Sequence, residues 1–221
     1  MILDLHCHTS WSFDCSMDPA KVARLARARG LDGIAITDHN EIGGALEVRR
    51  AAAGDLLVIV GEEIDTAAGD VIGLFLQEKI DAFDPLEAIR AIHGQGGVAV
   101  LPHPFAKTAS IDERVARALD ACEGFNARHS KEALVEGGPV EDRVARLARE
   151  YDLALTAGSD AHFAREVGRA RTIVPASGPE EAREAILRGD TALSGRRSSP
   201  FNLLASVALR SMRRLLHPEP D

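Results

Sequence analysis

Two histidines separated by a single residue follow the apolar residues at the start of the chain. The segment reads Asp4-Leu5-His6-Cys7-His8-Thr9. Because side chains alternate faces along an extended strand, Asp4, His6 and His8 are expected to share one face, with Cys7 on the other. Two imidazoles on one face at a strand end can bind a single divalent ion. The pair alone is weak evidence, because histidines also occupy cores and surfaces.

Short polar segments further along the chain carry more residues of the same types. They are Thr37-Asp38-His39, Gly61-Glu62-Glu63, His103-Pro104, His129 and Ser159-Asp160-Ala161-His162. Of the eight histidines, only His93 and His217 lie outside these segments and the first one. Charged side chains are seldom buried unless they are paired or bind a metal. Imidazoles and carboxylates that recur in this way therefore indicate a site for cations.

An alternation of strands and helices is expected to position these segments. Apolar and β-branched runs predict strands at residues 1–5, 33–37, 56–60, 70–76, 98–101, 122–126, 153–157 and 191–194. Helices are predicted at residues 18–29, 44–53, 85–93, 112–121, 140–151 and 179–188. Strands repeatedly followed by helices are typical of parallel β/α units, and so many units predict a barrel. Its carboxyl-terminal rim would gather the polar segments into one site.

Composition agrees with a single α/β domain. The chain has 221 residues, of which 45% are hydrophobic and 27% charged, an ordinary balance for a globular protein. No run approaches the roughly 18 apolar residues of a membrane span, so no membrane partner is expected. Three cysteines form neither an even set nor a C-x-x-C pair, which favours a reduced, cytoplasmic location. The net charge of −8 argues against a stable nucleic-acid partner.

Taken together, the motifs resemble those of the polymerase and histidinol phosphatase (PHP) domain. The similar segments are Asp4-Leu5-His6-Cys7-His8-Thr9, Ile36-Thr37-Asp38-His39-Asn40, Gly61-Glu62-Glu63, His103-Pro104 and Gly158-Ser159-Asp160-Ala161-His162. The resemblance implies an α/β fold, a distorted (β/α)7 TIM-like barrel, in which residues 1–195 form a metal-dependent phosphoesterase domain. Residues 196–221 would be a C-terminal extension.

The resemblance also implies a set of ligands for two or three divalent metal ions. A first ion would be held by His6, His8, Glu63 and Asp160, a second by Glu63, His103 and His129, and a third by Asp14, His39 and His162. Mixed imidazole and carboxylate ligands suit Zn²⁺, Mn²⁺ or Fe²⁺ better than Ca²⁺ or Mg²⁺. Asn126 is an alternative to His129. Of Glu62 and Glu63, alternation allows only one to face the site, and the family pattern selects Glu63.

The implied activity is hydrolysis of small phosphomonoesters or nucleotide-type phosphates, with metal-activated hydroxide attacking phosphorus. The candidate catalytic residues are Asp38, His162 and Asp160, and either Asp38 or His162 could protonate the leaving group. Asp4 could orient a ligating imidazole. The basic residues next to the motifs, Lys107, Arg128 and Arg165, are candidates for binding the phosphate of a small phosphorylated substrate.

Two other functions remain open. A PHP module that binds metal could act as a scaffold or regulatory partner, although a retired site would be expected to lose ligands. An amidohydrolase-like C–N hydrolase could also use a histidine pair on a barrel strand. Such enzymes commonly supply a ligating lysine, and no lysine follows a predicted strand between Glu63 and His103.

Apolar residues recur at helical spacing near the end of the chain. They are Phe201, Ala205, Leu209, Met212 and Leu216. This pattern predicts an amphipathic helix that packs its apolar stripe on the barrel.

Overall fold

The computed structural model describes residues 1–106, 110–129, 140–199, 201–202 and 205–206. These residues form one nine-stranded sheet with the order β7-β6-β5-β4-β3-β2-β1-β8-β9. The strands are β1 (Ile2–Asp4), β2 (Gly33–Ile36), β3 (Leu57–Thr66), β4 (Gly69–Leu74), β5 (Val98–Leu101), β6 (Ala121–Asn126), β7 (Ala154–Gly158), β8 (Ala170–Ile173) and β9 (Ala192–Gly195). At the far side, β7 meets β8, where Ala157 N–H donates to Thr172 Oγ1 over 2.7 Å. The sheet is thus nearly closed, and the predicted α/β barrel is confirmed.

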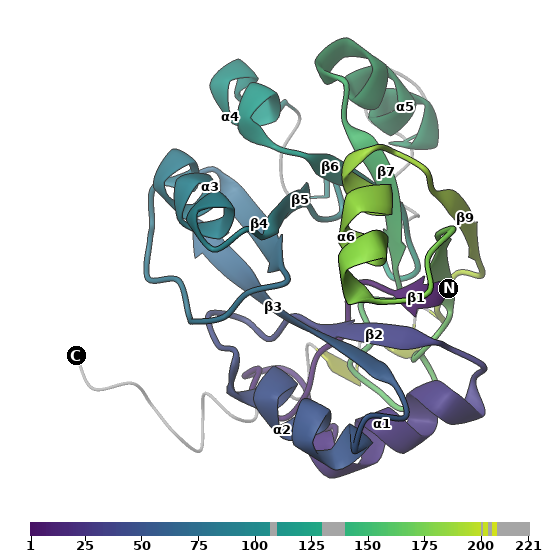
Figure 1. Ribbon diagram of the computed structural model, residues 1–221. Coiled ribbons are helices and arrows are strands. Elements are labelled where there is room, and N and C mark those ends of the chain that lie inside the picture. Colours follow the sequence, from purple (N-terminus) through teal and green to yellow (C-terminus); the bar gives the residue numbers. More distant parts are fainter. Residues whose placement is uncertain (107–109, 130–139, 200, 203–204, 207–221) are drawn as a thin grey trace.

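Helices cover the outside of this barrel. They are α1 (Pro19–Ala28), α2 (Gly43–Ala52), α3 (Pro85–Gly94), α4 (Glu113–Ala118), α5 (Val140–Tyr151) and α6 (Pro179–Leu187). Asp18 and Asp84 begin α1 and α3 as N-caps, each followed by a proline that suits the first helical turn. In Figure 1, α1 to α5 lie around the sheet, whereas α6 lies across it.

Two apolar cores follow from the alternation of side chains along the strands. The inner core contains one or more residues from most strands: Leu3, Leu5, Ala35, Ile59, Ile72, Leu74, Val98, Val100, Ala121 and Ala154. Residues Ala182, Ala185 and Ile186 of α6 pack against these side chains, so α6 closes one end of the barrel. The outer core joins the other faces of the strands to α1–α5 and includes the buried thiols of Cys7, Cys15 and Cys122.

The sheet is not uniformly parallel, which differs from the prediction. Strand β4 pairs antiparallel with both β3 and β5, and β8 pairs antiparallel with β1. Strand β8 was not predicted. Strand β3 is longer than the predicted run of residues 56–60, because its second half continues as a hairpin with β4 after the ladder with β2 ends at Val60. Glu63 therefore lies within β3, just beyond the carboxyl end of the part of β3 that pairs parallel with β2.

The described end of the chain turns a polar face inward. Phe201, a member of the predicted apolar stripe, is 77% exposed. Its neighbour Asn202 and the later Ser206 are buried. The stripe residues Leu209, Met212 and Leu216 lie outside the described residues. No helix in the described ranges is long and apolar enough to cross a membrane.

Candidate metal centre

Main-chain hydrogen bonds bring the polar segments together at one rim of the barrel. Asp160 N–H donates to the His6 carbonyl over 2.8 Å, and His8 N–H donates to the Ala161 carbonyl over 3.0 Å. On the next strand pair, Glu63 N–H donates to the Asp38 carbonyl over 3.1 Å. Segments that are far apart in the sequence are therefore held side by side before any side chain interacts.

Four side chains from these segments surround one point. His6 Nε2 and His8 Nε2 lie 3.0 Å apart, and they are 3.4 and 3.3 Å from Glu63 Oε2. Asp160 Oδ1 is 3.8 and 3.4 Å from the same two nitrogens. A tetrahedral ion with ligands at about 2.0–2.1 Å would hold its ligand atoms about 3.4 Å apart. The spacing of these four atoms fits a divalent cation.

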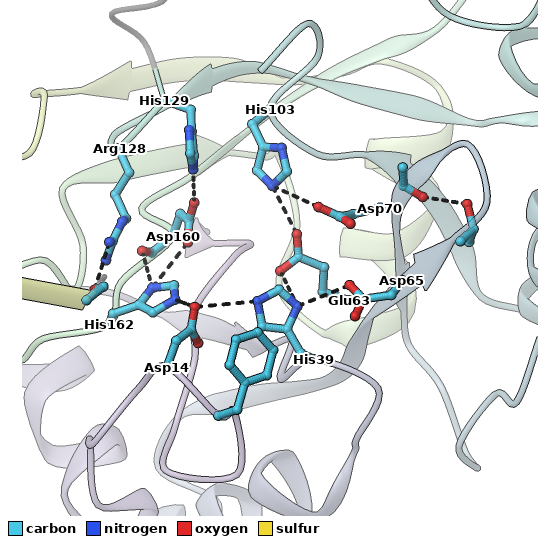
Figure 2. Close-up of a pocket in the computed structure, with 14 residues that line it drawn as sticks. Asp14, His39, Glu63, Asp65, Asp70, His103, Arg128, His129, Asp160 and His162 are labelled. Carbon is cyan, nitrogen blue, oxygen red and sulfur yellow. Dashed lines mark hydrogen bonds and ion pairs between the residues drawn. The ribbon is translucent and has the colours of Figure 1, made fainter. Parts of the chain in front are cut away.

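The second oxygen of Glu63 faces another group of side chains. Glu63 Oε1 is 3.0 Å from His103 Nε2, and the ring of His103 lies 4.8 Å from that of His129. His129 Nε2 is 3.5 Å from Asp160 Oδ2 (Figure 2). The carboxylates of Glu63 and Asp160 thus each direct one oxygen toward His6 and His8. Each directs its other oxygen toward this second group of side chains. Asp70, which the sequence did not indicate, also lies here, 3.7 Å from His103 Nε2.

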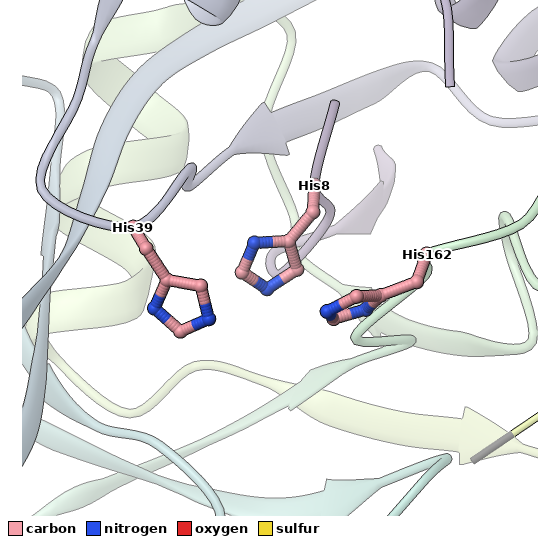
Figure 3. Close-up of side chains that lie close together, drawn as sticks. All are labelled: His8, His39 and His162. Atoms are coloured by element: carbon pink, nitrogen blue, oxygen red, sulfur yellow. The ribbon is translucent and has the colours of Figure 1, made fainter. Parts of the chain in front are cut away.

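A third group of imidazoles lies beside the first (Figure 3). The ring of His8 is 4.3 Å from that of His162 and 4.9 Å from that of His39. Asp14 Oδ2 lies 3.0 Å from His162 Nε2 and 3.8 Å from His39 Nε2. Asp14 Oδ1 is buried without a hydrogen-bond partner among the described residues, and His39 Nδ1 lies 3.4 Å from Glu63 Oε2. A buried polar atom without a partner is costly, so Asp14 Oδ1 also fits a bound cation.

Three of these histidines are bound through the nitrogen that faces away from the centre. His6 Nδ1 is 3.0 Å from Glu123 Oε1, His8 Nδ1 is 3.0 Å from Ser12 Oγ, and His162 Nδ1 is 3.0 Å from the Asp160 carbonyl. When Nδ1–H donates to such an acceptor, Nε2 keeps its lone pair, and all three Nε2 atoms face the centre. This arrangement is typical of histidines that bind metal.

Burial and neighbouring charges set the protonation of the site. Burial, together with the nearby His162, lowers the pKa of His8 to about 3, so its ring is neutral at pH 7. Burial also disfavours a charged His39, but Glu63 and Asp65 outweigh it and raise its pKa to about 9. The pKa of Glu63 is held well below its usual value, because the neighbouring histidines outweigh the effect of burial. The carboxylate is therefore ionised, as a metal ligand must be.

Glu123 was not predicted to belong to the site, yet it connects several of its parts. Besides contacting the His6 ring, it accepts a hydrogen bond from His103 N–H over 2.7 Å and from Asn126 Nδ2 over 2.8 Å. A bulge between Glu123 and Phe125 allows Glu123 and Asn126, three residues apart, to face the same side. The sequence alone does not reveal such a bulge.

Asp38 is buried beside the metal-binding groups and holds the loop after β1. Its carboxylate accepts hydrogen bonds from Thr9 N–H and Thr9 Oγ1, both over 2.6 Å, and from Ser12 Oγ over 2.7 Å. Because the Ser12 hydroxyl donates to Asp38, its oxygen acts as an acceptor, for His39 N–H over 3.1 Å and for His8 Nδ1–H. Asp38 thus orients His8 through Ser12, and it does not line the cavity of the site.

Asp4 contacts the main chain rather than an imidazole ring. It accepts hydrogen bonds from Ser159 N–H and Gly168 N–H, both over 2.8 Å, and burial raises its pKa to about 6. It therefore does not share the orientation predicted with His6 and His8. The cause is a break in the strand: Leu3 and Leu5 face the inner core and Cys7 the outer one, so the alternation is reset after Leu5.

The sequence left two choices of ligand open, Glu62 or Glu63 and Asn126 or His129, and the contacts of these side chains distinguish the alternatives. Glu63 faces the histidines, whereas Glu62 Oε2 accepts a hydrogen bond from Ile80 N–H over 2.9 Å on the other side of the strand. The side-chain oxygen Oδ1 of Asn126 accepts hydrogen bonds from the main-chain N–H groups of Arg128 and His129 over 2.9 and 3.0 Å. Asn126 thus shapes the loop that presents His129 to the centre.

The three basic candidates are placed differently. Arg128 lines the cavity, where its guanidinium forms a 3.1 Å ion pair with Glu166. Arg165 is exposed, lies over the ring of Phe163 and does not line the cavity. Lys107 lies outside the described residues.

All predicted metal ligands except His6 and His8 line one cavity of about 450 Å³. At its mouth the ring of Phe13, 41% exposed, stacks on His39 with 5.0 Å between the ring centres. His103 and Asp160 have positive φ angles of 30° and 52°, a conformation that non-glycine residues seldom adopt. Such strain is often found at functional sites.

Comparison with known proteins identifies relatives of this chain. A family model described as PHP-associated matches residues 141–191. The uncharacterized protein MJ1587 of Methanocaldococcus jannaschii is 36% identical over 143 residues, which are 58% of this chain and 84% of that protein. The uncharacterized protein MJ0417 of the same organism is 35% identical over 182 residues, which are 77% of this chain and 69% of that protein.

Solved structures share the fold at low identity. One, from Bifidobacterium adolescentis and provisionally named a metal-dependent phosphoesterase, is 19% identical with a TM-score of 0.60, covering 85% of this chain and 96% of that one. An amidohydrolase from Chromobacterium violaceum, with bound sulfate and no metal, is also 19% identical, with a TM-score of 0.61 over 75% and 89% of the two chains. These structures show the shared fold. The motifs, the family model and the two relatives show that the chain belongs to the PHP domain family.

Proposed function

We propose that this protein is a metal-dependent phosphoesterase that hydrolyses small phosphomonoesters or nucleotide-type phosphates. The observation that carries the proposal is the arrangement of His6, His8, Glu63 and Asp160 around one point at the spacing of metal ligands. Both carboxylates extend a second oxygen toward His103 or His129. This arrangement supports adjacent cations that share ligands, which is the usual basis of metal-assisted phosphoryl chemistry.

The groups of donors would hold two or three divalent ions, of which Zn²⁺, Mn²⁺ and Fe²⁺ best match their chemistry. When bound, the ions would supply hydroxide at neutral pH and neutralise the charge of the phosphoryl oxygens. Contacts of Nδ1 with Glu123, Ser12 and the Asp160 carbonyl orient the rings of His6, His8 and His162 so that each Nε2 faces the centre, as ligation requires. His162 is accordingly a ligand in this proposal.

Asp38 is assigned a positioning role. Its three hydrogen bonds to Thr9 and Ser12 fix the loop that carries His8, and these contacts occupy the carboxylate. A substrate in the cavity does not reach it, because Asp38 is not part of the cavity wall. We therefore favour orientation of His8 over proton transfer for this residue.

The cavity suits a small ester whose phosphate enters between the carboxylate-histidine groups and Arg128. Arginine binds phosphate oxygens through its planar set of N–H groups. Phe13, which is 41% exposed and lines the cavity, can contact the remainder of the substrate. Arg165 is not needed in this arrangement.

The test is a phosphate-release assay on purified protein loaded separately with Mn²⁺, Fe²⁺ and Zn²⁺, with elemental analysis of each preparation. Substrates are nucleoside monophosphates and sugar phosphates, and Asp160→Asn is the matched inactive control. The proposal predicts metal-dependent release that the variant lacks. Metal-loaded protein that releases phosphate from no substrate would contradict it.

The same preparations distinguish the two other functions. A C–N hydrolase would release amine from amides or open cyclic ureides to ureido acids, and it would release no phosphate. The one lysine between Glu63 and His103 is Lys79, which is exposed and pairs with Glu41 over 3.1 Å, so it does not support this chemistry. A scaffold would contain metal and release neither product.

A further inference from the structure

Three polar residues at the end of the described chain recur every fourth position. They are Ser198, Asn202 and Ser206. Residues 201–202 and 205–206 are helical, so Asn202 and Ser206, four apart, share one helical face, and Ser198 lies just before these helical residues. Asn202 is 1% and Ser206 5% exposed, whereas Phe201 on another face is 77% exposed. A polar face is therefore the one turned toward the barrel.

This polar face is bound by residues next to the metal centre. Ser198 N–H donates to the Ala127 carbonyl over 2.7 Å, and Ser198 Oγ donates to Glu166 Oε1. Asn202 accepts a hydrogen bond from Arg165 Nε over 2.6 Å and donates to Ser198 Oγ over 2.9 Å. Arg165 thus holds the C-terminal segment in place, a role that also explains why it is absent from the cavity wall.

Ser206 contacts a residue of the cavity itself. Arg128 Nη2 donates to Ser206 Oγ over 2.9 Å, while Arg128 Nη1 donates to Glu166 Oε2 over 3.1 Å. Glu166 is fully buried and also accepts from His162 N–H, so the guanidinium is tied to the loop of a metal ligand. Arg128 and Ser206 line the same cavity as Asp160 and His162.

We propose that Ser206 is a positioning residue that holds the guanidinium of Arg128 in the orientation in which it binds the phosphate of the substrate. The proposal deepens the proposed phosphoesterase function and depends on it. Glu166 fixes one end of the planar guanidinium, and Ser206 fixes the other, so rotation of the plane is prevented. These two contacts use two of its five N–H groups, which leaves donors for phosphate oxygens. The C-terminal segment is then a part of the substrate site rather than an appended helix.

The physical effect should appear in substrate binding. Without the serine hydroxyl, the guanidinium of Arg128 keeps its charge and its pair with Glu166. It loses one of the two contacts that fix its orientation. Ordering it must then occur when phosphate binds, which weakens binding of the ester and of inorganic phosphate alike. The metal ligands are untouched, so turnover of bound substrate should change little.

The test compares Ser206→Ala with Ser206→Thr, which retains a hydroxyl, and with Phe201→Ala, which removes an exposed side chain of the same segment. For Ser206→Ala we expect KM for a phosphomonoester, and the inhibition constant of inorganic phosphate, to rise about three- to tenfold, as for loss of one typical hydrogen bond. Its kcat, metal content and Tm should stay near the wild-type values. Ser206→Thr should recover most of the loss, and Phe201→Ala should show none.

Three results would overturn the inference. If wild-type protein releases phosphate and Ser206→Ala has unchanged KM and phosphate inhibition, the positioning role is wrong and the proposed function stands. If KM rises only together with loss of metal or a lower Tm, the contact is merely structural. If metal-loaded wild-type protein neither releases phosphate nor binds inorganic phosphate, the inference fails together with the proposed function.

Discussion

At the residue scale, the site is made of two layers that differ in how far the sequence predicts them. The inward layer of histidines and carboxylates was expected from the motifs, and the structure brings its members together. The outward layer was not. Glu123 and Ser12, which hold His6 and His8 through their Nδ1 atoms, carry no motif of their own, because a bulge and a loop decide where they point. Their roles follow only from coordinates.

Replacing the inward carboxylate should abolish activity without unfolding the protein. Asp160→Asn keeps the shape of the side chain but removes the charge that faces His6 and His8 through one oxygen and His129 through the other. We expect phosphate release to fall at least about a hundredfold, with reduced metal content. Initial rates, elemental analysis and circular dichroism measure the three quantities. Wild-type rates at unchanged metal stoichiometry would remove Asp160 from the site.

The outward layer can be tested by its effect on metal affinity. Glu123→Gln removes the negative charge and keeps one acceptor oxygen, which can serve either His6 Nδ1–H or the main-chain N–H of His103, whereas the carboxylate serves both through its two oxygens. We expect metal affinity to fall about 10- to 100-fold, since partners of ligating imidazoles commonly have effects of this size. Competition with a chromogenic chelator gives the affinity. Glu150→Gln, an exposed change on α5, is the matched control and should have none of this effect.

At the element scale, periodicity predicted helices and strands well where an element is regular and failed where backbone geometry changes. The break after Leu5 turns Asp4 away from His6 and His8, and strict alternation could not foresee it. Strand β3 continues as a hairpin with β4, because antiparallel pairing takes over where the ladder to β2 ends. Strand β8 is short and follows a loop, so its four residues gave no clear pattern.

The close approach of β7 to the segment after β1 makes a specific prediction about a glycine. A Cβ at Gly158 would meet His6 Cβ and lie 2.5 Å from Glu123 Oε1. Gly158→Ala is therefore expected to lower the free energy of unfolding by about 1–3 kcal/mol and to displace His6, with loss of metal. Urea denaturation and elemental analysis measure both effects.

A second glycine provides the control for this substitution. An added Cβ at Gly94, at the end of α3, meets nothing within 4 Å. Gly94→Ala should be neutral or stabilise the protein by up to about 1 kcal/mol, because alanine favours the helix. Equal destabilisation by the two substitutions would show that the contact between Gly158 and His6 has no special importance.

At the scale of the whole molecule, the barrel was predicted from the number of alternating elements, but its manner of closure was not. Antiparallel β8 and β9 complete the sheet beside β1, and α6 fills one end of the barrel with Ala182, Ala185 and Ile186. The polar rim lies at the carboxyl ends of the parallel strands, as barrel folds place their sites. One end of the molecule is therefore packed with apolar side chains and the other with ionisable ones.

Metal removal should destabilise the whole molecule, because the native rim binds cations and the unfolded chain does so weakly. Ligands that bind only the folded state stabilise it in proportion to the logarithm of their concentration. We expect a chelator to lower Tm by several degrees, given about 2–4 °C per kcal/mol for a chain of this size. Calorimetry measures the change, and Asp160→Asn should show a smaller response. Identical melting of metal-loaded protein and of protein from which the chelator has removed the metal would disagree with this prediction.

The cysteines of the outer core have a practical consequence for following motion in this protein. Cys7, Cys15 and Cys122 are fully buried, and burial raises the pKa of Cys122 to about 12. A thiol reagent can reach them only when the surrounding strands separate. Cys7 lies between His6 and His8 in the sequence. The rate at which its thiol is alkylated would therefore report how often the rim opens, without an added label.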